Sequence, residues 1–126
     1  MKVLIVEDDA AIAKLYKTEL VSKGYQVEVA PNGDLGIAKA KQWHPDLALV
    51  DIMMPKTNGI DVLKAIKADP DIKNTIIIML TNFGQEDLVK DAINGGADEY
   101  VLKYQITPAE VADKVKQHLA KVSFPA

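Results

Sequence analysis

Short apolar runs alternate with longer segments of mixed character along most of the chain. Five runs have the length of a β-strand: "VLIV" (3–6), "YQVEVA" (25–30), "LALV" (47–50), "TIIIML" (75–80) and "EYVL" (99–102). The first, third and fourth are apolar at nearly every position, which is typical of parallel strands that are covered on both faces. The second run alternates more, so we expect it at an edge of the sheet.

The segments between and after these runs have helical spacing. One helix is expected over residues 33–43, ending before a His-Pro pair. The apolar positions of the others are Ile12, Leu15, Tyr16 and Leu20; Ile60, Leu63 and Ile66; Leu88, Ala92 and Ile93; and Val111, Val115 and Leu119. The last helix has the clearest start, because Thr107 can cap it, Pro108 suits its first turn and Glu110 completes a capping box.

A strand followed by a helix therefore occurs five times. Right-handed crossovers turn this order into a parallel sheet with helices on both faces. We predict one α/β domain over residues 1–126, with a core at about 2–121 and a doubly wound, flavodoxin-like five-stranded sheet of order 2-1-3-4-5. In such sheets ligands bind beyond the carboxyl ends of the strands, so the residues that follow each strand carry the functional prediction.

Composition excludes several classes of function. The 126 residues carry a net charge of −3 with no basic run, which disfavours direct nucleic-acid binding. No apolar stretch reaches the roughly 18 residues of a membrane span, and the N-terminus becomes acidic too early for a signal peptide. The absence of cysteine excludes disulfides and thiolate zinc sites. We therefore expect a cytoplasmic protein that does not enter a membrane.

Polar residues follow four of the five predicted strands. Glu7 and Asp8 come after the first strand, and Asp51 comes after the third. Thr81 follows the fourth strand and Lys103 follows the fifth. Because the first and third strands are neighbours in the predicted sheet order, their acids should meet in one crevice, with the threonine and the lysine alongside.

Crowded carboxylates repel one another, and a hard divalent cation relieves that repulsion. We predict a Mg²⁺ site, with Mn²⁺ as an alternative ion. Asp8 and Asp51 would supply carboxylate ligands, Glu7 would hold a metal-bound water, and the backbone carbonyl of Met53 would supply a further oxygen. A carboxylate in such a place can also act as a nucleophile toward a phosphoryl group and form an aspartyl-phosphate.

Each of these residues taken alone has a simpler interpretation. Asp8 or Asp9 would serve as a helix cap, and Lys103 would be a solvated lysine. We expect His44 and His118 at the surface. The prediction of a site rests on the joint pattern of acids, hydroxyl and lysine at successive strand ends.

With these residues in place, the sequence resembles the receiver domain of two-component response regulators. The matching elements are "LIVEDD", "LVDIMMPKTNGIDVL", "IIIMLT" and "GGADEYVLK", and the resemblance runs from about residue 2 to about residue 121. It implies that Asp51 is the phospho-acceptor and Lys103 the phosphate-binding lysine. It also implies that Thr81 is the switch hydroxyl and Tyr100 the switch aromatic residue, and it supports the metal ligands named above.

The resemblance also implies partners. A histidine kinase or a histidine phosphotransfer protein would donate the phosphoryl group. The surface of the fourth helix, fifth strand and fifth helix would signal to an unknown output protein or domain. We expect a signalling phospho-acceptor with only self-directed phosphotransfer and slow autodephosphorylation, not an enzyme. It would be a monomer or a phosphorylation-dependent dimer, and either a stand-alone receiver or one excised from a larger regulator.

The sequence departs from the family pattern at three places. Tyr104 follows Lys103 where proline is usual, so we predict a trans bond and a shifted loop, since a non-proline cis bond costs about 2.5–4 kcal/mol. Asn82 stands after the switch threonine, where a small residue is favoured, so we expect its larger side chain to narrow access to the phosphoryl group. Met53 and Phe83 stand two places after the acceptor aspartate and that threonine. Neither can position water well, so we expect slow self-dephosphorylation.

The sequence is also compatible with three other functions. A flavodoxin would share the sheet order, but the acidic loop at residues 7–9 would repel its phosphate. A metal-dependent phosphohydrolase or nuclease is the enzyme alternative, although "DIMMP" lacks the second acid of a toprim-type site. A receiver-like binding module that is never phosphorylated is the third, and Tyr104 keeps it open.

Overall fold

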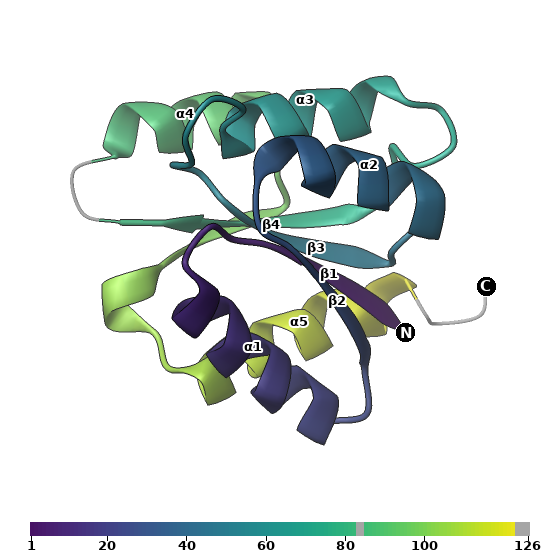
Figure 1. Ribbon diagram of the computed structural model, residues 1–126, viewed down its shortest axis with the longest axis vertical. Helices are drawn as coiled ribbons and strands as arrows, with labels where there is room; N and C mark the ends of the chain where they lie inside the picture. The colour runs from purple at the N-terminus through teal and green to yellow at the C-terminus, as the bar shows by residue number, and fades with distance from the viewer. Residues whose placement is uncertain (83–84, 123–126) are drawn as a thin grey trace.

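The computed structural model describes residues 1–82 and 85–122, without the side chain of Val122. The strands are β1 (Lys2–Val6), β2 (Gln26–Ala30), β3 (Leu47–Asp51), β4 (Ile76–Thr81) and β5 (Glu99–Leu102). The helices are α1 (Ala10–Ser22), α2 (Gly33–Trp43), α3 (Gly59–Ala68), α4 (Glu86–Asn94) and α5 (Pro108–Val122), with a short 3₁₀ helix η1 (Lys103–Gln105) after β5. The strands and helices alternate as the hydrophobic pattern predicts (Figure 1).

The described strands form one parallel five-stranded sheet of order β2-β1-β3-β4-β5. This confirms the predicted fold class and places β2 at an edge, where its alternating pattern suits partial exposure. Strands β3 and β4 are buried at every position. They lie inside the sheet with helices over both faces, which explains why their sequences are almost entirely aliphatic.

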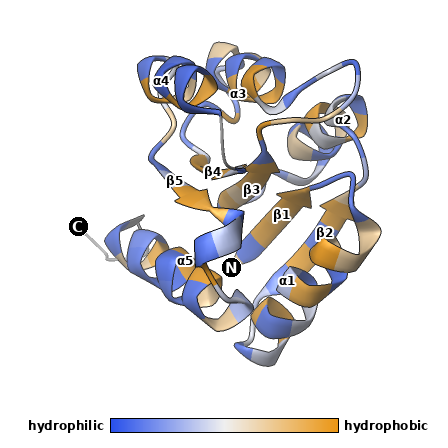
Figure 2. Cartoon of the chain, turned by 90° about the vertical axis from the view of Figure 1, so that its left-hand side faces the viewer, coloured by the Kyte–Doolittle hydropathy of each residue, from blue (hydrophilic) through white to orange (hydrophobic). Residues whose placement is uncertain are grey.

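Two apolar layers hold the helices on the sheet. Helices α2, α3 and α4 cover one face, and α1 and α5 cover the other (Figure 1). Alternate residues of each strand enter opposite layers, as the pleat requires: Leu4 packs toward the first face and Ile5 toward the second. Figure 2 shows the result, with mostly apolar strands and helices that carry both polar and apolar faces.

The predicted bounds of α2 at residues 33–43 and the predicted start of α5 are confirmed. The capping box at the start of α5 is confirmed, because Glu110 N–H donates to Thr107 Oγ1 at 3.2 Å and Thr107 N–H donates to Glu110 Oε1 at 3.1 Å. Two residues predicted on the apolar faces of their helices do not lie there, since Leu15 is 58% exposed and Ile93 is 46% exposed. The core face of α1 runs through Ala13, Tyr16 and Leu20, at a spacing of three and four residues, and position 15 lies outside that stripe.

The histidine prediction also needs a correction. His118 is half-buried instead of lying freely at the surface, and its Nε2 lies 2.6 Å from Glu99 Oε1. The Lys114 ammonium lies 2.9 Å from Glu99 Oε2. Burial disfavours the charge of Glu99, but the bonds from Lys114 and His118 outweigh burial and lower the pKa of Glu99. The cluster ties α5 to the edge strand β5.

The start of α3 is packed tightly against the end of β3. A Cβ added at Gly59 would lie 2.3 Å from the backbone oxygen of Asp51 and 2.7 Å from Cα of Ile52. Real Cβ atoms do not approach backbone so closely, so only glycine allows this contact. The helix is held by a capping box between Asn58 and Asp61, which fixes its first turn behind Asp51.

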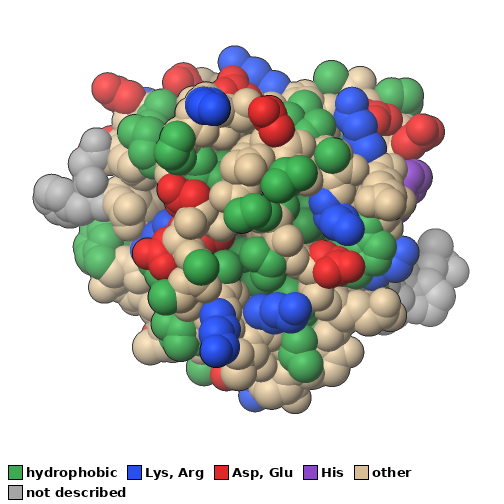
Figure 3. Space-filling view, viewed as in Figure 1, with side chains coloured by type: hydrophobic (Ala, Val, Ile, Leu, Met, Phe, Trp, Pro, Cys, Tyr) green, Lys and Arg blue, Asp and Glu red, His purple; other side chains and the backbone are tan. Residues whose placement is uncertain are grey.

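The outer surface mixes charges of both signs. On the face shown in Figure 3, basic and acidic side chains are interspersed among polar and apolar ones. Within the described residues, no helix has the length and apolar character needed to cross a membrane.

Candidate functional site

Three carboxylates converge at the carboxyl ends of β1 and β3. Glu7 and Asp8 follow β1, and Asp51 is the last residue of β3; ligand oxygens of the three lie within 4.8 Å of one another. Glu7 is 1% and Asp51 2% exposed, whereas Asp8 is exposed. The predicted meeting of these acids is therefore what the structure shows.

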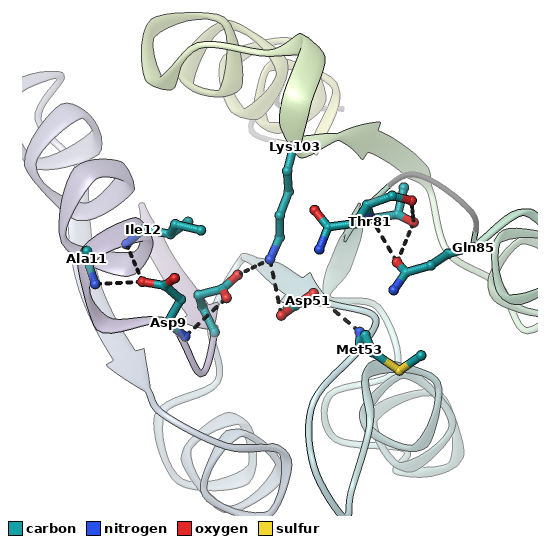
Figure 4. A network of polar contacts seen from close by, with 10 residues as sticks. Asp9, Ala11, Ile12, Asp51, Met53, Thr81, Gln85 and Lys103 are labelled. Carbon is teal, nitrogen blue, oxygen red and sulfur yellow. Dashed lines mark hydrogen bonds and ion pairs between the residues drawn. The ribbon is translucent and has the colours of Figure 1, made fainter.

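Lys103 lies against two of these acids. It comes from η1, directly after β5, and its ammonium lies 2.8 Å from Glu7 Oε2 and 3.1 Å from Asp51 Oδ2. Figure 4 shows its side chain extending toward Asp51. The lysine side chain is only 9% exposed, so the interpretation as a solvated surface lysine is wrong.

The burial of these charges shifts their pKa values. The pKa of Asp51 is raised from 3.8 to about 7, chiefly by burial and next by the charge of Glu7, against the opposing effect of Lys103. Burial also lowers the pKa of Lys103, but its bonds to Glu7 and Asp51 outweigh burial, so its pKa lies above the usual value. Burial raises the pKa of Tyr16, whose hydroxyl is influenced by the same three charges. The sequence pattern placed Tyr16 on the apolar stripe of the first helix and not among the site residues.

The donor set fits a hard divalent cation. Asp8 has no hydrogen bond or ion pair with any described residue, so its carboxylate is available as a ligand. Glu7 Oε1 accepts from Asp9 N–H at 3.2 Å while its other oxygen pairs with Lys103, which suits a role through a water. Three carboxylates with one lysine leave excess negative charge, which Mg²⁺ or Mn²⁺ can neutralise.

The two aspartates after β1 have different roles. Asp9 is the N-cap of α1, and its Oδ1 accepts from the N–H groups of Ala11 and Ile12 at 3.0 and 3.1 Å. The capping interpretation therefore holds for Asp9 and not for Asp8, which leaves Asp8 for the site.

Met53 lies at the rim of the site. Its N–H donates to Asp51 Oδ1 at 3.3 Å, and the residue is 52% exposed. An exposed thioether beside the Asp51 carboxylate offers no strong donor or acceptor for water. The role of the Met53 carbonyl as a metal ligand stays a prediction.

Thr81 ends β4 with its side chain fully buried. Its hydroxyl lies 2.8 Å from Gln85 Oε1 and 3.2 Å from the Asn82 carbonyl oxygen, and among the described residues it makes no bond to Asp51 (Figure 4). Tyr100 on β5 is 43% exposed. Sequence reasoning missed Gln85, which stands four residues after Thr81 in a connection without regular pattern.

The remaining departures have separate outcomes. All peptide bonds of the described part are trans, including Lys103–Tyr104 as predicted. Asn82 is exposed, and its N–H bonds to Gln85 Oε1 at 2.9 Å. Phe83 lies outside the described residues. The predicted narrowing of the site by Asn82 and the predicted shift of the loop after β5 remain untested.

A model of the family described as the response regulator receiver domain matches residues 3–116, which is most of the chain. The chain belongs to this family. It is therefore a receiver domain of a two-component system, which is a class of signalling protein. The resemblance noted in the sequence is thereby confirmed.

Curated relatives of this receiver domain include transcriptional regulators. The transcriptional regulatory protein ResD of Bacillus subtilis (strain 168) is 39% identical over 122 residues, covering 97% of this chain and 49% of ResD. The DNA-binding dual master transcriptional regulator RpaA of Synechocystis sp. is 38% identical over 105 residues, covering 81% of this chain and 42% of RpaA. The chain thus spans about half the length of the curated relatives it matches.

Solved structures match over nearly the whole receiver domain. The signal receiver domain of a signal transduction histidine kinase from Syntrophus aciditrophicus has a TM-score of 0.88 at 30% identity, covering 99% of this chain and 94% of that one. A CheY-like response regulator receiver domain protein from Methanospirillum hungatei JF-1 has a TM-score of 0.86 at 34% identity, covering 95% and 94%. These likenesses agree with the sheet order observed here.

Proposed function

We propose that Asp51 is the phospho-acceptor of this receiver domain and that the reaction depends on Mg²⁺. The observation that carries the proposal is the position of Asp51. Its carboxylate ends a fully buried strand, lies beside Glu7 and Asp8, and is bonded by the ammonium of Lys103. Phosphoryl transfer mostly needs positioning and charge neutralisation, and this arrangement offers both.

The proposed reaction transfers a phosphoryl group from a phosphohistidine of a histidine kinase or phosphotransfer protein. An Asp51 oxygen forms a bond to phosphorus as the phosphorus–nitrogen bond breaks, and the imidazole leaves with the electron pair and takes up a proton. The ionised carboxylate is the nucleophile. Lys103 donates hydrogen bonds to the transferred oxygens. Mg²⁺ held by Asp8, Asp51 and the Met53 carbonyl, with Glu7 acting through a water, would neutralise their charge.

Phosphorylation would then change one surface of the domain. The new phosphoryl oxygens attract the Thr81 hydroxyl, and its movement leaves room for Tyr100 to turn inward from its exposed position. This local charge event would shift the surface of α4, β5 and α5 between two states. Identical structures with and without Mg²⁺ and a phosphoryl mimic would contradict this switch.

The output of the domain lies with another protein or another part of the same chain. ResD and RpaA are named as transcriptional regulators, and each is about twice as long as the region matched here. The proposal is that this receiver controls such an output through the α4–β5–α5 surface and acts as a signalling phospho-acceptor. DNA binding by the receiver domain itself is not part of the proposal.

Mass spectrometry after treatment with acetyl phosphate and Mg²⁺ tests the acceptor directly. The wild type should gain the mass of one phosphoryl group, and Asp51→Ala should gain none. Asp9→Asn, a neighbouring acid outside the proposed ligand set, should be modified like the wild type. No adduct on the wild type would favour a receiver-like binding module, and turnover of phosphate esters would favour a phosphohydrolase.

A further inference from the structure

Gln85 holds two donors with a single oxygen. Its Oε1 lies 2.8 Å from Thr81 Oγ1 and 2.9 Å from the backbone nitrogen of Asn82 (Figure 4). A backbone N–H can only donate, so the atom facing Asn82 must be the amide oxygen and not the amide nitrogen. That assignment fixes the direction of the second bond: the Thr81 hydroxyl donates to Gln85 Oε1, which is nearer than its other acceptor, the Asn82 carbonyl oxygen at 3.2 Å.

This bond uses the only proton that the Thr81 hydroxyl has. A hydroxyl group donates one hydrogen bond, and phosphoryl oxygens accept bonds but donate none. Thr81 therefore cannot donate to Gln85 and to a phosphoryl group on Asp51 at the same time. The Thr81 hydroxyl is fully buried, so it shares its proton with protein acceptors and not with water, and donating to the phosphoryl group means giving up the bond to Gln85.

Gln85 also borders the space into which the switch would move. A surface depression of about 320 Å³ is lined by Thr81, Gln85 and Tyr100, together with residues of α4 and η1. Tyr100 stands at this depression and is 43% exposed. The bond to Gln85 keeps the Thr81 side chain beside this depression, where an inward turn of Tyr100 would need room.

We propose that Gln85 is a positioning residue that holds Thr81 in the unphosphorylated arrangement and sets the threshold of the switch. This rests on the proposed function of Asp51 and adds a residue to it. Phosphorylation must break the Thr81–Gln85 bond before Thr81 can reach the phosphoryl oxygens. Removing the acceptor on Gln85 therefore favours the phosphorylated arrangement, and keeping an acceptor there preserves the threshold.

Four variants isolate this bond from general effects on folding. Gln85→Met removes the acceptor with little change of shape, and Gln85→Glu retains an acceptor oxygen. Thr81→Val removes the hydroxyl, and the double variant Thr81→Val/Gln85→Met closes a double-mutant cycle. The measured quantity is the affinity for beryllofluoride, a phosphoryl mimic, in the presence of Mg²⁺, followed by amide NMR signals. The thermal transition of each variant verifies that it is folded.

The cycle has a defined expected result. Gln85→Met should bind the mimic roughly two- to tenfold more tightly than the wild type, the range expected for one lost hydrogen bond in the competing state. Gln85→Glu should show no such gain. In the Thr81→Val background, Gln85→Met should change nothing, because no hydroxyl remains to be held. An unchanged affinity in Gln85→Met, or the same gain without the Thr81 hydroxyl, would overturn the proposal.

A metal-free measurement separates this proposal from the proposed function. Side-chain couplings of Thr81 report its rotamer without Mg²⁺ or mimic. The wild type and Gln85→Glu should show one rotamer, whereas Gln85→Met should populate a second. The same rotamer distribution in all three would overturn the role of Gln85. A wild type that shows these couplings yet never binds the mimic would instead overturn the role of Asp51.

Discussion

The Lys103 ammonium lies between the carboxylates of Glu7 and Asp51, 2.8 Å from Oε2 of the first and 3.1 Å from Oδ2 of the second. Both acids are almost fully buried, so the lysine is the counter-charge that allows two carboxylates to share this space. The same bridge couples the end of β5, where signalling is proposed to leave the domain, to the proposed acceptor on β3.

Removal of this counter-charge should destabilise the fold. In Lys103→Met the two buried carboxylates face each other without a cation, so the free energy of unfolding at pH 8 without metal should fall by about 3 kcal/mol. Urea denaturation measures this change. Lys116→Met removes an exposed lysine from α5 and should stay within about 0.5 kcal/mol of the wild type. Equal stability of the two variants would show that the bridge contributes little.

The pKa of Asp51 predicts an unusual pH dependence. Because its pKa is about 7 in the fold and 3.8 ordinarily, the folded state binds the proton more tightly than the unfolded chain. Stability should therefore fall as pH rises from about 4 to about 7 and stay low above that. Asp51→Asn cannot ionise, and since each pH unit between the two pKa values is worth about 1.4 kcal/mol, it should be more stable by up to about 4 kcal/mol at pH 8.

Denaturation in EDTA at pH 4, 6 and 8 measures this difference between Asp51→Asn and the wild type. The difference should be smallest near pH 4, where the folded carboxyl is protonated and the unfolded one, with a pKa of 3.8, is only partly ionised. A difference that is constant over this range would mean that ionisation of Asp51 is not its source.

Much of this fold was predictable because a strand that is buried on both faces has a continuous run of apolar residues. Strands β3 and β4 need apolar residues at every position, and the acids that follow the central strands stand out against them. The sequence predicted that Lys103 lies near Glu7 and Asp51, but not that it bonds to both. Those contacts depend on the path of η1, which the sequence pattern does not show. Gln85 was not predictable, because its bond to Thr81 depends on the path of the connection from β4 to α4. Leu15 and His118 were misjudged because residues beside an apolar stripe can lie on either side of its boundary.

Mg²⁺ should stabilise the wild type, and the stabilisation should depend on Asp8 but not on the adjacent Asp9. A ligand that binds only the folded state raises the free energy of unfolding by about 2.7 kcal/mol at one hundred times its dissociation constant. Asp8→Asn removes a proposed ligand and should lose most of this gain. Asp9→Asn makes the same charge change one residue away, but asparagine still caps α1, so the gain should remain.

Thermal denaturation over a series of MgCl₂ concentrations measures this effect, with choline chloride at twice each concentration matching the chloride and part of the ionic strength. Calorimetric titration of the folded proteins provides the dissociation constants independently. If Asp8→Asn and Asp9→Asn respond equally to Mg²⁺, the proposed ligand set is wrong.

Met53 should prolong the life of the phosphoryl group on Asp51. Its exposed apolar side chain lies at the rim beside the acceptor, where a polar group would help to position an attacking water. Met53→Asn should shorten the lifetime by about two- to tenfold, the worth of one hydrogen bond to that water. Met53→Leu keeps an apolar side chain of similar volume and should leave the lifetime unchanged. Phosphate loss is timed after removal of the donor; loss from the wild type within seconds, or equal lifetimes in all three proteins, would contradict a protective role for this methionine.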